Sequence, residues 1–537
     1  MLILLPIGLL LAATLALTIL ERVRPHFGTS WLIAAMASIA AWLVIFFMRL
    51  RLPTTLEILS WETPESGLSG HFSFLLDYQS WPYVLALATV TLAVILTGAA
   101  RTRYDSSPQS WAASMAITAL GLISLQSGTS LTMMASWVLV DGIELVYLLR
   151  LKDAPRFQFR IIASYAVRTA SVLLLFLGTM IGWQTAPHFD LTAIPQPAGF
   201  IFLLAAGFRL GVFPLNLPFL QEPEMRRGVG NILRLAPVAS SLVLLARLPN
   251  NLLAGDLQSW RWLFNALLAI AALYAAFRWV SANDEIEGRP FWIVAWAALA
   301  AVSVLNGQPQ ASLPWGLALI LAGSLLFLYY PRVQRMNFLL YFGLVGLIGA
   351  PYTPLASGWL GLTGNGISFW TFLFILAHAL MVFGYLTRIF QPGGEAGALE
   401  SWAKVVYPLG LILIIQATLG LGVVGWPGSF TIGVWWLPLV SALLVAAALI
   451  LIRRFGISPP YLQLPASSGL GKALDWLIPR IEPVFRLEWV YQLLLKIYTL
   501  LGSLMRTFST VLEGPGGILW AILLLVLLLA ALRGGGA

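Results

Sequence analysis

The feature that most constrains this chain is a series of long apolar runs that recurs from one end to the other. A helix needs roughly 20 apolar residues to cross a bilayer core about 30 Å thick, and many of these runs approach that length. Charged residues make up 10% of the chain, against about 25% in a soluble domain. A soluble core could not hide so much apolar surface, since the scaling of surface with chain size would leave far too much of it in contact with water. We therefore expect an all-α polytopic membrane protein.

The apolar runs predict about sixteen transmembrane helices, with breaks near the seventh and the twelfth. They lie at 2–20, 31–48, 82–100, 110–126, 129–149, 161–183, 197–216, 229–246, 262–280, 290–305, 312–330, 336–353, 368–390, 405–426, 434–452 and 516–532. The first run lacks a basic leader and a small-residue cleavage site, so we interpret it as a retained span.

Three parts are expected along the chain. Residues 1–126 hold the N-terminal spans and an outside, hairpin-like segment at 51–81 that carries four carboxylates. Residues 127–453 form the core. In 454–537, charged and apolar positions mix before a last span, which favours an amphipathic cytoplasmic segment. A plain cytoplasmic linker is the alternative.

The basic residues give an orientation. With the N-terminus outside, 23 of the 31 Lys and Arg fall in loops on one side, five fall on the other side, and three lie within spans. Cytoplasmic loops carry the excess of Lys and Arg. The pattern predicts a multi-pass protein of the cell inner (plasma) membrane, and it explains the net charge of +9 without nucleic acid.

The composition gives little support for a metal site or a cofactor-binding site. The chain has no cysteine, which excludes thiolate metal sites and cysteine-bound iron–sulfur clusters. Its four histidines are scattered, and no phosphate-binding loop is visible. We therefore expect no cofactor, no metal and no self-contained active site.

Charged residues inside predicted spans are the functional candidates, because an ionisable group at the bilayer centre costs roughly 2.5–3.5 kcal/mol. Asp141 and Glu144 lie three residues apart in the fifth span and share a helix face. Arg209 precedes Pro214 and Pro218 in the seventh span. Broken helices are tolerated at membrane depth only where the backbone faces protein or a water-filled cavity. Arg209 needs an anion, and Asp141 or Glu144 is the natural partner.

Other candidates carry a weaker signal. Arg234 lies three residues before Pro237 in the eighth span, where we predict another break, and Pro351 marks the break in the twelfth span. Arg168 in the sixth span and His378 in the thirteenth are isolated polar residues. For all these groups the alternative is a position at the headgroups, with long side chains reaching the interface.

Several motifs occur in a recognisable order. Phe72–Asp77, followed by Ser80, precedes the third span, and Asp141 or Glu144 stands in the fifth. The sequences FRLGVFPLNLPFLQEPE and VGNILRLAPVASSLVLLARL then cover the seventh and eighth spans. This order resembles the antiporter-like membrane subunits of respiratory complex I (NADH:quinone oxidoreductase), of multisubunit cation:proton antiporters and of membrane-bound hydrogenases. The resemblance implies a core of two helix repeats in 127–453.

The departures from that family are informative. Arg209 stands at the family's lysine and Arg234 at a histidine, and arginine keeps its proton where lysine can lose it. In the eleventh span Gly323 and Leu319 replace ionisable residues, and the break around Pro351 carries no charge. The chain thus resembles a divergent member, and the resemblance implies a neutral second half-channel and an incomplete proton path.

The resemblance implies a membrane subunit of an ion-translocating complex, moving protons or sodium, with other membrane subunits and the lipid bilayer as partners. Ion translocation or coupling would involve Asp141, Glu144, Arg209, Arg234 and Arg168. Redox chemistry would reside on partner subunits. A non-transporting structural anchor of such a complex is one alternative. A polytopic lipid-linked glycosyltransferase, using the carboxylates of 51–81, is another.

Overall fold

The structure of the protein is a computed structural model. It describes residues 2–24, 30–61, 70–98, 107–151, 155–186, 189–213, 215, 227–329, 336–364, 366–390, 402–455 and eight residues between 496 and 526. The chain divides into two compact units, Met1–Ala466 and Ser467–Ala537. The predicted amphipathic segment and the predicted last span at 516–532 fall mainly outside the described residues. The fold described below is that of the first unit.

Helices dominate this unit, joined by short connections, with one pair of strands near the start. The elements are α1 (Leu5–Val23), α2 (Ser30–Met48), β1 (Thr54–Trp61), β2 (Gly70–Leu76), α3 (Trp81–Gly98), α4 (Pro108–Leu125), α5 (Ser130–Leu151), α6 (Pro155–Thr185), α7 (Gln196–Leu210), α8 (Val229–Ala246), α9 (Arg261–Ser281), α10 (Glu285–Leu305), α11 (Ser312–Leu328), α12 (Phe338–Ile348), α13 (Leu355–Gly358), α14 (Leu360–Thr363), α15 (Phe369–Ile389), α16 (Ala403–Val424) and α17 (Trp436–Phe455).

The expected all-α membrane architecture is present, and the described residues do not confirm the predicted number of sixteen spans. Among the described residues, 11 helices are long and apolar enough to cross a membrane, against about sixteen predicted runs. The helices α7 and α12 are apolar yet have only 15 and 11 residues. These are the two runs in which the sequence predicts breaks, and in both a glycine ends the helix.

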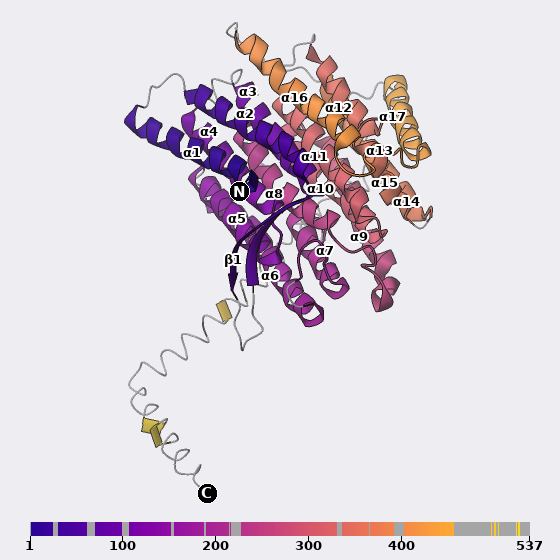
Figure 1. Ribbon diagram of the computed structural model, residues 1–537. Coiled ribbons are helices and arrows are strands. Elements are labelled where there is room, and N and C mark those ends of the chain that lie inside the picture. The colour runs from indigo at the N-terminus through magenta and orange to yellow at the C-terminus, as the bar shows by residue number, and fades with distance from the viewer. Residues whose placement is uncertain are drawn as a thin grey trace. The chain divides into compact units, whose positions relative to one another are not determined.

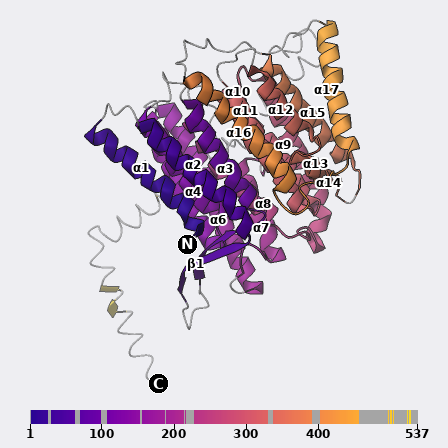
Figure 2. The same ribbon diagram turned by 45° about the horizontal axis from the view of Figure 1, so that its top comes forward.

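The bundle is layered from inside to outside. The best spanning windows of α8 and α10 are completely buried, and those of α3 and α11 nearly so, whereas only 33% of α1 and of α2 is buried. In Figures 1 and 2, α8, α10 and α11 lie inside the bundle, with α1 and α2 toward one end and α15 and α17 toward the other. The outer helices therefore carry apolar side chains on the surface of the bundle.

The segment expected to form a hairpin contains the two strands. They pair antiparallel from Thr54 opposite Leu76 to Trp61 opposite Gly70, with one irregularity after Glu57. Backbone bonds tie β2 to the α4–α5 connection, since the Leu75 N–H donates to the Gln126 carbonyl at 2.6 Å. We call the side of the bundle that carries this hairpin the hairpin side.

Glycines end the helices of the seventh and twelfth predicted spans. The helix α7 stops at Leu210 because Gly211 adopts a left-handed conformation, with φ of 81°. Pro214 and Pro218, predicted to break this span, lie outside the described residues. Likewise α12 stops at Ile348, where Gly349 has φ of 79°, and the chain turns at Pro351 before α13.

The third predicted break is wrong. Pro237 lies inside α8, which continues as one helix from Val229 to Ala246. Proline removes one backbone hydrogen bond from a helix, yet α8 is buried along its whole length, so its neighbours hold it in place. The hydroxyl groups of Ser240 and Ser241 donate to the Pro237 carbonyl at 2.8 and 3.0 Å.

Candidate functional site

The helix α5 places two carboxylates on its inward face. Its buried positions follow the three-to-four residue spacing of a helix, whereas the intervening apolar positions are exposed. The buried set is Trp137, Val140, Asp141, Glu144 and Leu148, and the exposed set is Val138, Leu139, Ile143 and Val146. Asp141 lies about 16 Å along the helix from Ser130, at the rise of about 1.5 Å per residue. Both carboxylates are therefore inside the bundle rather than at its surface.

The pairing expected for Arg209 is present. Its Nη1 lies 2.5 Å from Asp141 Oδ2, and its Nη2 lies 2.6 Å from Asp141 Oδ1. Such two-point contacts between a guanidinium and a carboxylate are among the strongest and most directional ion pairs. The Arg209 Cζ also lies 4.5 Å from the ring centre of Trp137, one helical turn before Asp141. The Asp141 carboxylate and the Trp137 ring thus hold the guanidinium of Arg209 in place from two directions.

Two further arginines complete the network. Arg168 on α6 donates to Glu144 and also contacts Asp141 Oδ1 at 3.3 Å. Arg234 on α8 donates to Glu144 Oε1 at 2.6 Å. Each of the five side chains is at most 2% exposed. Four consecutive helices, α5 to α8, therefore converge on one buried charged network.

Arg168 carried the weakest sequence signal of the five, yet the structure places it between both carboxylates. Its position could have been inferred from connectivity, because α6 follows α5 through a short connection and antiparallel neighbours pack side by side. Arg168 also interrupts an otherwise apolar stretch, and a charge within such a stretch requires a counter-ion.

Among the described residues, three guanidinium groups and two carboxylates form this network. Taking charges from water into a low-dielectric interior costs several kcal/mol per ion unless they are paired. Arginine does not give up its proton under accessible conditions. The three arginines therefore act as fixed positive charges within this network.

The region around α11 and α12 is built around stacked and tilted aromatic rings. A chain of indole rings runs through it, with centroid separations of 5.0 to 5.8 Å between neighbours. These buried residues, which we call the tryptophan chain, are Trp279, Trp292, Trp296, Trp315 and Trp359. Trp292 donates to the Leu319 carbonyl at 3.0 Å. A Cβ on Gly323 would lie 2.6 Å from Trp292 Nε1, so the indole occupies the space beside both positions where ionisable groups are missing.

His378 lies against the tryptophan chain, apart from the charged network. Its ring centre is 4.7 Å from that of Trp359. Its Nε2 donates to the Leu347 carbonyl at 3.0 Å, and Nδ1 lies 2.7 Å from Ser441 Oγ. A carbonyl only accepts, so Nε2 carries the proton and Nδ1 is free to accept from Ser441. The imidazole has a structural role that joins the end of α12 to α17.

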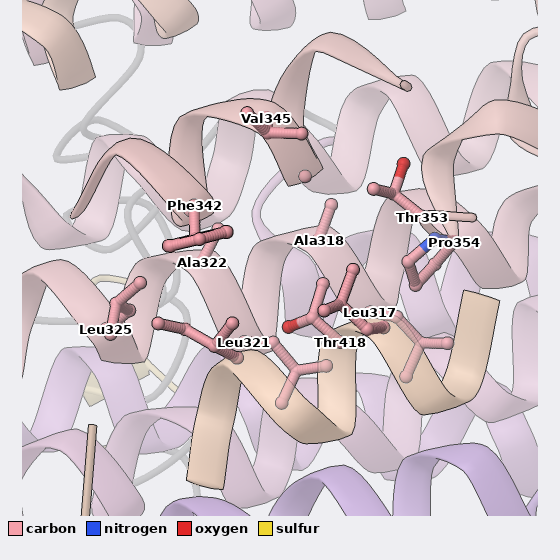
Figure 3. A pocket seen from close by; sticks show the side chains of 14 residues that line it. Leu317, Ala318, Leu321, Ala322, Leu325, Phe342, Val345, Thr353, Pro354 and Thr418 are labelled. Carbon is pink, nitrogen blue, oxygen red and sulfur yellow. The ribbon is translucent and has the colours of Figure 1, made fainter. Parts of the chain in front are cut away.

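The space next to this region is apolar as well. A cavity of about 30 Å³ lies between α11, α12 and α16. Figure 3 shows side chains such as Leu317, Leu321 and Phe342 around it, with Thr353 and Thr418 as the polar members. Among the described residues, no charged side chain lines this cavity. Its walls are therefore unsuited to binding an ion.

A second ion pair lies at the hairpin side, and sequence reasoning missed it. Arg247, at the end of α8, donates from Nη2 to Asp77 Oδ2 at 3.2 Å and from Nη1 to the Ser127 carbonyl at 2.7 Å. Burial alone would raise the pKa of Asp77, but the charge of Arg247 and hydrogen bonds from Ser80 and Gln79 outweigh it. The pKa of Asp77 is therefore held below its ordinary value. Sequence reasoning placed Arg247 in a loop and found no signal for this pair.

The carboxylates of the glycosyltransferase alternative can be located in the structure. Of the four carboxylates in 51–81, Glu57 lies on β1 and Asp77 is bound by Arg247, while Glu62 and Glu65 lie outside the described residues. The part of the chain that the structure describes contains no group of three His, Cys, Asp or Glu side chains suited to a metal.

Comparisons with known proteins address the fold. No protein-family model matches the chain, and neither does any curated protein sequence. Among solved structures, a chain of the Mrp complex from Dietzia sp. DQ12-45-1b is similar over the whole chain, with a TM-score of 0.68 and 15% identity. A chain of the membrane-bound sulfane sulfur reductase, an archaeal respiratory membrane complex, is similar over 98% of this chain, with a TM-score of 0.65 and 13% identity. The chain has the antiporter-like membrane-subunit fold.

This fold confirms the resemblance found in the sequence motifs. The chain spans 63% of the length of the Mrp chain that it matches and all of the reductase chain. Within the antiporter-like fold, the charged network occupies α5 to α8, and the tryptophan chain occupies the later helices. The buried charges of the later helices, such as Arg388 against the Trp279 ring, lie beside these aromatic rings rather than in the charged network.

Proposed function

We propose that this protein is a membrane subunit of a multisubunit, ion-translocating complex, in which the charged network of α5 to α8 couples ion movement to the partner subunits. The observation that carries the proposal is the buried network itself. Five ionisable side chains held together inside a membrane bundle are expensive to bury. In an antiporter-like fold, responding to an ion is the function that such a network supports best.

The proposed path is incomplete. A continuous route would need exchangeable groups along the later helices as well. There the tryptophan chain fills the space beside Gly323 and Leu319, and the adjacent cavity is apolar. Within the network, the guanidinium groups hold their protons, which leaves proton exchange to Asp141 and Glu144. We propose that this subunit contributes one charged half-path, with protons or sodium as the translocated ion.

The assemblies considered for this role are of the complex I, cation:proton antiporter and hydrogenase types. The similar solved structures belong to an Mrp complex and to an archaeal respiratory complex, which supports membrane subunits as partners. Any redox centre would then lie on a partner, and the outer helices, which are apolar and exposed, are suited to such contacts.

A non-transporting structural anchor is the second candidate, and the tryptophan chain favours it. Dense aromatic packing stabilises a bundle and excludes water, as an anchor requires. An anchor gains nothing, however, from five buried charges, because replacing buried ion pairs by apolar side chains is often neutral or stabilising. The charged network therefore separates the two candidates.

The test is ion transport by the purified assembly in sealed vesicles, with its subunits identified by mass spectrometry. We expect co-purifying membrane subunits and an ion flux that falls at least about tenfold in Asp141→Asn, a loss of about 1.4 kcal/mol. The matched control is Asp190→Asn, because Asp190 is half exposed beside His71 and is not part of the charged network. If both variants transport like the native protein, the translocation proposal fails and the anchor remains.

A further inference from the structure

The helix α16 carries a polar side chain on its outer face, well inside a span that is long and apolar enough to cross a membrane. Gln416 is exposed, and it lies about 20 Å along the helix from Ala403 and about 12 Å from Val424, at about 1.5 Å per residue. The hydrocarbon core of a bilayer is about 30 Å thick. The Gln416 amide therefore lies at the depth of the acyl chains rather than at the headgroups.

The Gln416 amide has no hydrogen-bond partner among the described residues. Exposed hydroxyl groups on other outer helices are satisfied within their own helix, since Thr18 and Thr169 donate to the carbonyl four residues back at 2.7 and 3.0 Å. An amide group both donates and accepts, and in hydrocarbon such a group is costly unless it is paired. Gln416 therefore needs a hydrogen-bonding partner from outside the described helices.

Gln416 lies in the middle of an exposed face of α16, whose positions follow the spacing of one helix face. We call this set the α16 stripe, and it consists of Val405, Leu409, Gln416, Leu419, Gly420 and Val423. A Cβ on Gly420 would meet no atom within 4 Å, so there is open space one turn after Gln416. Small residues let two transmembrane helices approach closely, and glutamine side chains hydrogen-bond across such contacts. The α16 stripe therefore has the features of a helix–helix contact face.

An apolar groove flanks the α16 stripe. Leu419 belongs to the stripe and also lines the cavity between α11, α12 and α16. Phe342 and Val345 line the same cavity from α12, as Figure 3 shows. These three side chains are 41–49% exposed, so the cavity opens at the surface of the bundle beside the stripe. A helix lying along the stripe can place an apolar side chain in this groove.

We propose that a transmembrane helix of a partner subunit packs along the α16 stripe and pairs a hydrogen-bonding side chain with the Gln416 amide. The inference rests on the proposed function, which supplies membrane subunits as partners, and it assigns one contact face within that assembly. The partner helix is apolar, with one polar side chain at the depth of Gln416 and an apolar side chain that enters the groove beside Leu419.

Other occupants fit this surface less well. Lipid acyl chains offer the amide no hydrogen bond. The predicted last span of this chain, 516–532, carries a single polar side chain, Trp520, and it stands close to the start of that span. A second copy of the chain would place Gln416 opposite Gln416 at equal depth, and the experiment below distinguishes this case.

Cysteine cross-linking tests the contact, because the native chain contains no cysteine. Gln416→Cys and Gly420→Cys are made singly in the full chain, labelled in native membranes with a thiol-reactive photo-cross-linker, and the adducts are identified by mass spectrometry. Gly420→Cys keeps the Gln416 amide, so it serves if Gln416→Cys loses the partner. The matched controls are Leu15→Cys on α1 and Leu173→Cys on α6, at positions that are 62% and 63% exposed. We expect one membrane subunit to be cross-linked at positions 416 and 420 and not at the controls.

Replacing the amide tests the hydrogen bond itself. Gln416→Leu removes the donors and the acceptor and keeps an apolar side chain on the stripe. We expect the cross-linked subunit to bind about threefold to thirtyfold more weakly, the range that one interhelical hydrogen bond contributes, measured as the fraction retained over a detergent titration. Gln184→Leu makes the same substitution at an exposed position of α6 and should leave the binding unchanged. Equal binding by Gln416→Leu and the native chain contradicts the proposal.

The identity of the adduct decides between the occupants. Adducts that contain this chain alone, whether from a second copy or from its own last span, overturn the partner subunit as the occupant. Absence of any protein adduct at positions 416 and 420 overturns the contact.

Ion flux separates the contact from the proposed function. If subunits co-purify and ions are transported, but no subunit is cross-linked at α16, the contact fails and the proposed function stands. If a subunit is cross-linked at α16 while Asp141→Asn transports like the native protein, the contact stands and the translocation proposal fails.

Discussion

The Asp141–Arg209 pair yields a prediction about stability that does not depend on knowing the transported ion. The perturbation is a double-mutant cycle made of Asp141→Asn, Arg209→Met and the double variant. Removing one partner of a buried ion pair leaves an uncompensated charge, which typically costs about 3–5 kcal/mol. Removing both partners removes that penalty.

The contacts predict that the two single variants are unequal. Among the described residues, Arg209 forms ion pairs with Asp141 alone, so Asp141→Asn leaves a buried guanidinium without a counter-ion. Asp141 retains Arg168 at 3.3 Å when Arg209 is lost. We therefore expect Asp141→Asn to cost about 3–5 kcal/mol and Arg209→Met to cost less, toward the lower end of that range.

The assay is the free energy of unfolding of the purified chain in mixed micelles, by titration with a denaturing detergent. The double variant should recover part of the loss, with a coupling energy of about 1–3 kcal/mol between the two sites. Asp190→Asn, at a half-exposed carboxylate beside His71, should stay within about 0.5 kcal/mol of the native protein. Strictly additive losses in the double variant would refute a direct buried pair.

Two other predictions concern local structure. The pKa of Asp77 is lowered in the folded protein, so its carboxylate stabilises the fold above the ordinary pKa of 3.8 and that contribution is lost as the pH falls below it. Asp77→Asn should therefore melt at a lower temperature than the native chain at pH 7, and the gap should narrow below about pH 4; a gap independent of pH contradicts this. Gly323→Ala should destabilise by about 1–3 kcal/mol, because its methyl group meets Trp292 at 2.6 Å. Gly8→Ala in α1, with nothing within 4 Å, is the control and should be neutral or slightly stabilising in the same melting assay; equal effects refute the packing argument.

Periodicity and charge predicted the membrane class because a helix in lipid must satisfy its backbone internally and show apolar side chains outward. The cost of burying a charge also predicted that Arg209 pairs with a carboxylate on α5. In the structure its Nη1 lies 2.5 Å from Asp141 Oδ2. The reasoning failed where tertiary packing overrides local signals. Pro237 predicts a break, yet the surrounding helices hold α8 continuous.

Long-range partners were the hardest to predict. Asp77 and Arg247 are 170 residues apart, and no local pattern links them. The tryptophan chain draws its rings from α9, α10, α11 and the α13–α14 junction, so its continuity appears only when these helices are packed together. Departures at Gly323 and Leu319 showed that charge was missing there, but not that Trp292 fills the space.

The central claim is that position 209 works as a fixed positive charge beside Asp141 in an ion-translocating assembly. The most direct measurement compares ion flux through vesicles containing the assembly with native protein, Arg209→Lys and Arg209→Gln. The account predicts that Arg209→Lys retains most of the flux because the charge is kept, and that Arg209→Gln loses at least about tenfold, or about 1.4 kcal/mol. Unchanged flux in both variants would contradict the claim.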